Sequence, residues 1–277
     1  MLPLLYLTDG RNRDLIPDEA GIDRAFRAAG IEIAVKVWDE TDWNSYANIL
    51  IRTPWDYALK TGLFLEKLSG AAQRGANILH PEKTVRWNID KSYLVELYRK
   101  GHKVVPTYIE DEFGPATPGK YFKKHGTLVL KPRIGAGGRD TFKVSPESAP
   151  SSYAALRGRS VLVQPFIPEI ETGGEYSFIF FGGEFSHAVL KKARGGEFRV
   201  QDRHGGTVEA YSPSAAEIGE AAALLRGGPD TVYARVDAVK RGGELLLMEL
   251  EILEPELFFR FSRDGMARFA AAVRKRL

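Results

Sequence analysis

The composition describes a globular chain and sets several functional classes aside. With 277 residues, 44% of them hydrophobic and 27% charged, the chain can bury a sizeable core and is long enough for two or three subdomains. Lysine and arginine number 39 against 36 acidic residues, with no long basic run, so we expect no nucleic-acid partner. The chain has no cysteine, which excludes disulfides and thiolate sites, and no apolar run of membrane-spanning length, so we expect a cytoplasmic protein without a membrane partner.

Residues 1–83 alternate short apolar runs with helical patterns. The runs LPLLYL, IEIAVKVW and NILIR are separated by amphipathic stretches over Asp18 to Ala29 and Gly62 to Arg74. This rhythm is typical of βαβ units. We therefore expect a small N-terminal parallel α/β domain, which helps to recognise the substrate.

Candidate substrate residues lie in the loops that follow two of these strands. They are Asp9, Arg11, Arg52, Trp55 and Tyr57. A parallel sheet presents its binding crevice at this edge, and Arg52 offers a planar fork for a substrate carboxylate, with the two aromatic rings as walls. An equally weighted alternative is a structural turn fixed by Pro54 and an Arg52–Asp56 ion pair.

Residues 84–163 contain a helix followed by a glycine-rich hairpin. The helix, WNIDKSYLVELYRKG, is predicted to end at Gly101, and KVVPTYIE leads from it toward the strand LVLKP. The loop after that strand, IGAGGRD, fits neither the P-loop nor the dinucleotide-binding template. Its glycines let backbone amides converge on a phosphate, but an ordinary glycine-rich hairpin turn explains the loop equally well.

Residues 164–277 are predicted to form an antiparallel sheet with a short closing helix, Asp264 to Arg276. The hairpin ARVDAVKRGGELLLMELEILEP places Asp237 on one strand and both Glu249 and Glu251 on the next. The two glutamates share a face because side chains alternate along a strand. Oxygen ligands of this kind suit Mg²⁺ with the phosphates of a nucleotide, and a solvated acidic face is the alternative.

Taken together, the motifs over about residues 84–260 resemble the ATP-grasp superfamily, in particular glutathione synthetases and D-alanine–D-alanine ligases. The resemblance implies an α/β (α+β) fold in which a nucleotide lies between a central lid subdomain and a C-terminal antiparallel-sheet subdomain. The implied nucleotide-binding residues are Lys91, Lys131, Gly135, Ala136, Gly137, Gly138, Arg139, Gln164, Phe166, Ile167 and Glu175.

The resemblance also implies the catalytic and metal-binding groups. Arg199 and Lys191 match basic positions near the transferred phosphoryl group, and Asp237, Glu249 and Glu251 match the ligands of Mg²⁺. Glu251 departs from the asparagine that is frequent in relatives. His187 and His204 are interpreted as packing or surface residues, since this chemistry needs no side-chain nucleophile.

The implied function is an ATP-dependent carboxylate–amine ligase that acts on small-molecule carboxylate and amine substrates. RTPWDY and RWNIDKSYL also resemble an ATP-grasp branch that includes a cycloserine-forming enzyme, so ring closure within one molecule is an alternative. A non-catalytic ATP-binding sensor is a further alternative from a different class. A homo-oligomer, either a dimer or a tetramer, is compatible with the resemblance.

Overall fold

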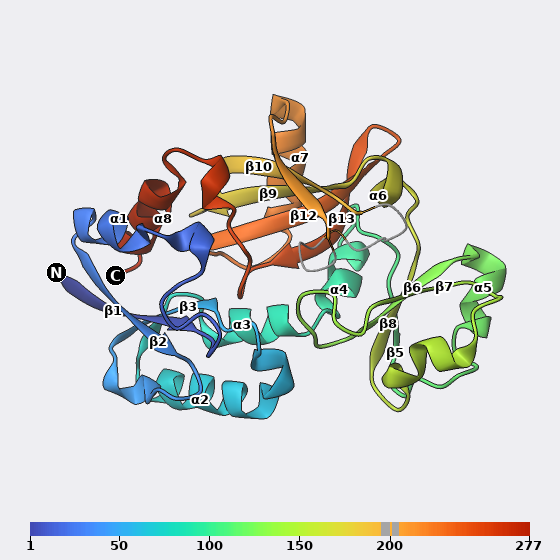
Figure 1. The fold of residues 1–277 in the computed structure, drawn as a ribbon, viewed down its shortest axis with the longest axis horizontal. Coiled ribbons are helices and arrows are strands. Elements are labelled where there is room, and N and C mark those ends of the chain that lie inside the picture. The colour runs from blue at the N-terminus through green and yellow to red at the C-terminus, as the bar shows by residue number, and fades with distance from the viewer. Residues whose placement is uncertain (195–199, 201–204) are drawn as a thin grey trace.

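The computed structural model describes residues 1–194, 200 and 205–277 and arranges them around three sheets (Figure 1). Among these residues, no helix is both long and apolar enough to cross a bilayer. The sheets follow one another along the chain, and the predicted combination of parallel and antiparallel sheets is confirmed. The subdomain boundaries near residues 83 and 163 stay predictions.

The first sheet is parallel, in the strand order β2-β1-β3-β4. Its strands are β1 (Leu2–Thr8), β2 (Ile31–Val37), β3 (Asn48–Thr53) and β4 (Asn77–Ile78), and the connecting helices are α1 (Ile22–Ala28) and α2 (Thr61–Gln73). Every residue of β1 from Leu4 onward is buried, as expected for a central strand covered on both faces.

The second sheet is small and antiparallel, in the order β5-β8-β6-β7. It comprises β5 (Tyr108–Glu110), β6 (Leu128–Pro132), β7 (Phe142–Val144) and β8 (Val161–Pro165), with α5 (Gly119–His125) and a 3₁₀ segment (Pro150–Leu156) beside it. The glycine loop connects β6 to β7, so the strand, loop, strand reading of this region is confirmed.

The third sheet has five antiparallel strands in the order β11-β10-β9-β12-β13. These are β9 (Glu175–Phe181), β10 (Glu184–Lys192), β11 (Thr207–Tyr211), β12 (Tyr233–Arg241) and β13 (Glu244–Glu251), accompanied by α6 (Glu169–Thr172), α7 (Ala215–Arg226) and α8 (Gly265–Arg274). The turn between β12 and β13 uses Gly242 and Gly243, which both have positive φ, the conformation that a tight two-residue hairpin requires.

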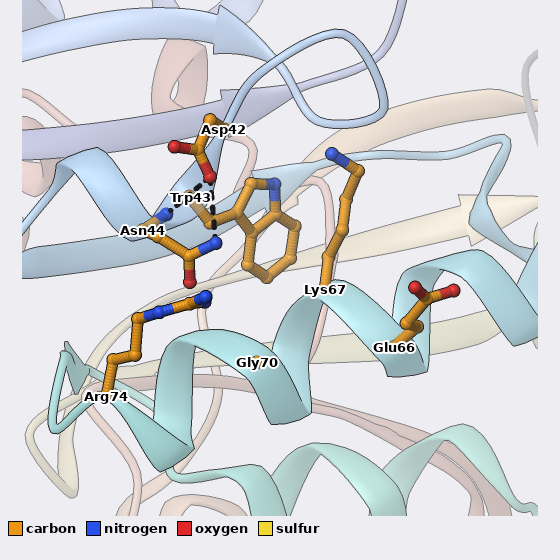
Figure 2. Close-up of a pocket in the computed structure, with 7 residues that line it drawn as sticks. All are labelled: Asp42, Trp43, Asn44, Glu66, Lys67, Gly70 and Arg74. Atoms are coloured by element: carbon orange, nitrogen blue, oxygen red, sulfur yellow. Dashed lines mark hydrogen bonds between the residues drawn. The ribbon is translucent and has the colours of Figure 1, made fainter.

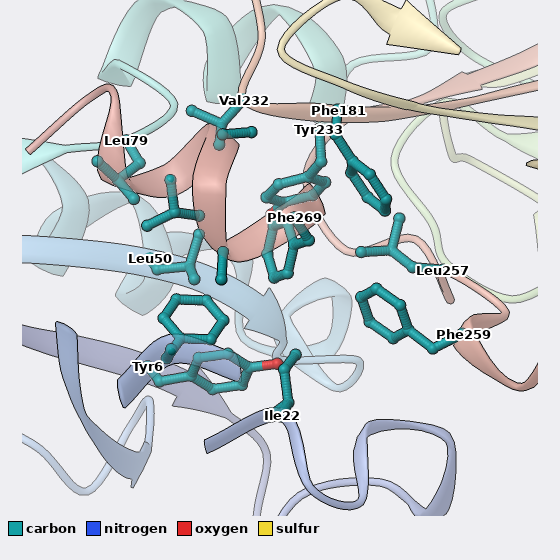
Figure 3. Packing of buried hydrophobic residues seen from close by; sticks show 14 of the residues in the cluster. Tyr6, Ile22, Leu50, Leu79, Phe181, Val232, Tyr233, Leu257, Phe259 and Phe269 are labelled. Carbon is teal, nitrogen blue, oxygen red and sulfur yellow. The ribbon is translucent and has the colours of Figure 1, made fainter. Parts of the chain in front are cut away.

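The first and third sheets share one hydrophobic core, because the C-terminal helix returns to the N-terminal domain (Figures 1 and 3). Phe269 of α8 packs edge-on against Phe26 of α1 and against Tyr233 of β12. Tyr6 of β1 and Phe181 of β9 belong to the same cluster. This core fixes the N-terminal sheet relative to the strands that carry the carboxylates.

The predicted linker helix is interrupted, which corrects the continuous helix expected from its sequence. Two helices form instead, α3 (Glu82–Ile89) and α4 (Tyr93–Arg99). At the break Asp90 adopts an extended backbone and its carboxylate accepts hydrogen bonds from Nε and Nη2 of Arg133, at 2.7 and 2.6 Å. The break places Lys91 at a corner beside β6, where its amide donates to the Arg133 carbonyl oxygen.

Candidate functional site

Strand register determines which side chains of the small sheet face the large one. Val129 and Lys131 of β6 pair with Gln164 and Leu162 of β8, so these four residues share a face. The opposite face packs into the subdomain's own core, and Leu162 packs with the core of the large sheet. Lys131 and Gln164 therefore point to the side on which the large sheet lies.

The acidic face of the large sheet forms as the strand periodicity predicted. Asp237 of β12 lies opposite Glu249 of β13, and Arg235 lies opposite Glu251. The register shifts directly after Asp237, and such irregularities alter the direction in which neighbouring side chains point.

Asp237 is surrounded by cations. Arg235 donates to both of its carboxylate oxygens, with Nε–Oδ1 and Nη2–Oδ2 distances of 2.9 Å, and Nζ of Lys191 lies 3.2 Å from Oδ2. Ser177 donates a further hydrogen bond to Oδ1. Burial opposes the charged form of Asp237, but Arg235 and Lys191 outweigh it and hold the pKa well below its ordinary value.

The other two carboxylates differ in their environment. Burial also opposes the charge of Glu249, yet Lys91 and Lys131 outweigh it and lower its pKa. For Glu251, burial dominates over its ion pair with Arg235 and raises the pKa to about 8. The surroundings of these three acids therefore shift their pKa values in different directions: Asp237 and Glu249 favour the charged form, and Glu251 favours the neutral form.

Two lysines reach the acidic face from the other side of the site. Nζ of Lys91 lies 2.8 Å from Oε1 of Glu249 and also donates to the carbonyl oxygen of Gly135 at 2.8 Å. Among the described residues, the side chain of Lys131 makes no hydrogen bond or ion pair, and burial lowers its pKa, with Glu249 opposing and Lys91 reinforcing the shift. A partly buried lysine without a hydrogen-bonding partner is costly, and an anion such as a phosphate would relieve that cost.

The acidic side chains of the large sheet are oxygen donors of the kind that a magnesium ion prefers. Within the described ranges, no three acidic or histidine side chains are close enough together to hold a metal by themselves. Mg²⁺ usually binds through one or two carboxylates plus waters and substrate phosphates. Asp237, Glu249 and Glu251 lie on paired strands, and one or two of their carboxylates would supply the hard oxygens of that mode, with Arg235 and the lysines as their present counterions.

The remaining residues predicted to bind nucleotide differ in their surroundings, and their contact with a nucleotide stays a prediction. In the loop after β6, Gly137 and Gly138 have positive φ, Ala136 packs toward the N-terminal core and Arg139 is exposed. Ile167 is buried in an apolar cluster that also contains Val105 and Val239, with Phe166 against it. The Lys143 ammonium lies 3.8 Å from the centroid of the Phe166 ring.

The predicted ribose and phosphoryl residues have different outcomes. Glu175 lies opposite Lys191 on adjacent strands and forms an ion pair with it, and both side chains are almost fully buried. Contact of Glu175 with a ribose stays a prediction. Arg199 and His204 lie outside the described residues. Nε2 of His187 donates to the carbonyl oxygens of Leu257 and Phe258, at 2.9 and 3.2 Å, as expected for a packing histidine.

Arg52 is completely buried, which argues against the proposed carboxylate clamp. Its Nη2 lies 2.6 Å from Oε1 of Glu19 and donates to the Pro255 carbonyl oxygen at 3.1 Å. The alternative pairing with Asp56 is not formed either, because Asp56 accepts a hydrogen bond from the Trp38 indole at 2.6 Å. The residue instead ties β3 to the segment that follows β13.

The other substrate candidates separate into two groups. The Trp55 indole donates to the Glu254 carbonyl oxygen at 2.9 Å, and the Tyr57 hydroxyl lies against the Glu254 carboxylate. These two residues are therefore next to the acidic strands. The Asp9 carboxylate accepts hydrogen bonds from the backbone amides of Arg11 and Asn12 within the same turn. The Arg11 side chain is exposed.

Two residues of the site were missed at the level of sequence. Arg235 precedes Asp237 by two residues, so the alternation that grouped the acids also places this arginine on their face. Glu254 lies beyond the end of β13, where no periodicity applies. Burial raises its pKa to about 7, with Lys91 opposing and Glu249 reinforcing the shift.

A separate pocket lies on the N-terminal domain between α2 and a 3₁₀ turn at Trp43–Ser45 (Figure 2). It measures about 280 Å³ and is lined by Asp42, Trp43, Asn44, Glu66, Lys67, Gly70 and Arg74. None of the predicted site residues lines it. The Asp42 carboxylate accepts hydrogen bonds from the backbone and side-chain nitrogens of Asn44 inside the turn.

Comparison with known proteins identifies both parts of the chain. Residues 4–80 match the family model of the D-cycloserine synthetase DcsG N-terminal domain, and residues 115–226 match the ATP-grasp domain of prokaryotic glutathione synthetase. The cycloserine biosynthesis protein DcsG of Streptomyces lavendulae is 27% identical, over 99% of this chain and 98% of that protein. A glutathione synthetase of Neisseria meningitidis is 24% identical over 84% of this chain and 74% of its own length.

Solved structures agree with the sequence matches. The crystal structure of D-cycloserine synthetase DcsG superimposes with a TM-score of 0.87 at 26% identity, covering 99% of both chains. D-alanine–D-alanine ligase from Bacillus anthracis shares the fold with a TM-score of 0.65 at 14% identity, again over 99% of both chains. The two matched domains, the shared fold and the basic and acidic residues between the sheets lead to one conclusion: residues 115–226 are an ATP-grasp domain, and the chain as a whole resembles the ligases built on this fold.

Proposed function

We propose that this protein uses ATP and Mg²⁺ to activate a small carboxylic acid, of the amino-acid or short-peptide class, for attack by an amine. The observation that carries the proposal is the meeting of Lys91, Lys131 and Lys191 with the carboxylates of β12 and β13. Such a set can neutralise a triphosphate and position it for phosphoryl transfer.

The reaction has two bond-forming steps. A carboxylate oxygen takes the γ-phosphoryl group of ATP, and ADP leaves. An amine then attacks the acyl carbon, phosphate departs with the bonding electrons of the C–O bond, and the nitrogen loses one proton. Negative charge changes position at each step, so fixed cations are the protein's main contribution.

Each cationic side chain lies where it suits one step of this reaction. Lys131, on the face of β6 that points toward the large sheet, and Lys91, bonded to the glycine loop, are suited to the phosphates. Arg235 lies at the junction of the acidic strands and the segment after β13, where its guanidinium can bind oxygens of the acyl group once its carboxylate partners hold metal. Mg²⁺, when bound by Asp237, Glu249 and Glu251, supplies Lewis-acid neutralisation of phosphate charge.

The substrate end of the site is the contact between the N-terminal loop and Glu254. Trp55 and Tyr57 come from the domain that the DcsG family model matches, and both contact Glu254. A carboxylate beside two aromatic residues is a suitable partner for the ammonium group of an amino-acid substrate. The N-terminal match also favours a second candidate function, in which acid and amine belong to one molecule and a ring closes.

Substrate-dependent release of ADP tests the proposal. Amino acids, their O-substituted derivatives and short peptides are screened with ATP and Mg²⁺, singly and in pairs. Ligation requires both members of a pair and gives a product with their combined mass less water, whereas ring closure proceeds with one compound. ATP binding without any stimulated ADP release across the screen would support a sensor instead. A cytoplasmic homo-oligomer, dimer or tetramer, is part of the proposal, and sedimentation tests the assembly.

A further inference from the structure

The side-chain amide of Gln164 carries both a donor and an acceptor, so its orientation decides which base edge it can recognise. It shares a face of the small sheet with Lys131, so in the proposed function it lies on the wall that a bound nucleotide would contact. The amide can present NH₂ or the carbonyl oxygen to that space, and the two choices favour opposite partners. Neighbouring groups must select between them.

Thr107 makes this selection. Its hydroxyl donates its single proton to the Val105 carbonyl oxygen at 2.8 Å, so toward Gln164 it can only accept. Nε2 of Gln164 accordingly donates to Oγ1 of Thr107, also at 2.8 Å. A reversed amide would place two oxygens against each other without a proton between them.

The anchor behind this chain of hydrogen bonds is rigid. The Val105 amide donates to the Leu247 carbonyl oxygen at 3.0 Å, and the Leu247 amide donates to Lys103, so the segment is attached to β13. Val105 itself is fully buried in the apolar cluster that contains Ile167. Strand β13 therefore fixes Val105, Val105 orients the Thr107 hydroxyl, and this hydroxyl fixes the orientation of the Gln164 amide.

The oxygen of the amide is left for a ligand. Among the described residues, no donor forms a hydrogen bond with Oε1 of Gln164. This oxygen is also not one of the fully buried side-chain atoms that lack a partner. We propose that Thr107 is a specificity-determining residue: by fixing the Gln164 amide, it makes the site select a 6-aminopurine nucleotide over a 6-oxopurine nucleotide. This inference rests on the proposed function, because it requires a nucleotide at this wall.

The chemistry of the two bases explains the selectivity. Adenine offers an exocyclic NH₂ to the fixed acceptor, whereas hypoxanthine presents a carbonyl oxygen at the same place, which leaves two acceptors facing each other. When the protein fixes a buried acceptor, a ligand that presents a second acceptor binds weakly, because neither oxygen then has a hydrogen-bond donor.

The test compares dissociation constants of ATP and inosine triphosphate, each with Mg²⁺, by calorimetry. We expect the unaltered protein to prefer ATP by about tenfold or more. Thr107→Val removes the hydroxyl and frees the amide to reverse, so the ratio should fall toward unity, mainly through tighter inosine triphosphate binding. Thr107→Ser keeps the hydroxyl and should keep the ratio.

A second variant separates orientation from packing. In the Thr107→Val background, Gln164→Glu supplies oxygens only and should restore the preference for ATP. Normal ATP binding with an unchanged ratio in Thr107→Val would overturn this inference alone, as would an equal loss in the valine and serine variants. Failure of the unaltered protein to bind ATP would overturn the proposed function, and this inference with it.

Discussion

Arg52 offers a prediction that separates a structural role from substrate binding. Replacing it with methionine keeps most of the side-chain volume but removes the charge that compensates Glu19. Both side chains have 0% exposure, and their ion pair measures 2.6 Å. Removing one partner leaves the other charge buried and unpaired, which costs about 3 to 5 kcal/mol. The variant also loses the contact with the Pro255 carbonyl oxygen and the guanidinium packing on Tyr233.

The assay is urea and thermal unfolding of Arg52→Met, Glu19→Met and the double variant. At roughly 2 to 4 °C per kcal/mol, each single variant should melt on the order of 10 °C lower. The double variant removes both charges and should recover most of the loss, because well-packed apolar residues can replace a buried ion pair at little cost. Near-normal unfolding of Arg52→Met with a selective rise in substrate KM would refute this reasoning and return Arg52 to the substrate site.

Three further predictions concern phosphate binding, the metal site and pH. Lys131→Met should abolish most of the melting shift that ATP and Mg²⁺ produce, whereas Lys120→Met, which changes an exposed lysine of the same subdomain, should retain it. Glu249→Gln should raise the Mg²⁺ concentration needed for half-maximal ADP release at least tenfold, and an unchanged requirement would contradict its role as a ligand. Burial lowers the pKa of His80 to about 3, so the unfolded state takes up a proton first as the pH falls below about 6.5. The contribution of His80 to stability should therefore decrease by on the order of 4 kcal/mol between pH 6.5 and 3. It is read as the difference between the urea-unfolding profiles of the unaltered protein and His80→Gln, because the raised pKa values of Glu251 and Glu254 act in the opposite direction in both proteins.

The alternation of side chains along the strands was sufficient to predict the acidic face, but not the residues and chain breaks that surround it. Alternation along two strands grouped Asp237 with Glu249, and the structure pairs them directly. The interruption at Asp90 could not be anticipated, since its sequence is compatible with a helix and its stabilising partner, Arg133, is 43 positions away. Partnerships of this kind depend on tertiary packing, to which single-sequence patterns are blind.

The same limit applies to the substrate loops. The position of Arg52 after a parallel strand suggested a binding crevice, but its partner Glu19 is 33 residues away and reaches it only through the fold. Glu254, by contrast, became a candidate when the structure placed it against Tyr57 and Lys91. Both outcomes reflect contacts between elements, which decide whether a charged residue is a structural tie or an accessible ligand.

The central claim is that a substrate carboxylate becomes an acylphosphate. It is tested most directly with the substrate found in the screen, labelled with ¹⁸O in its carboxylate and turned over with unlabelled ATP. The account predicts ADP and inorganic phosphate that carries one ¹⁸O atom, transferred when the amine displaces the phosphate. Unlabelled phosphate, or formation of AMP and pyrophosphate, would contradict it.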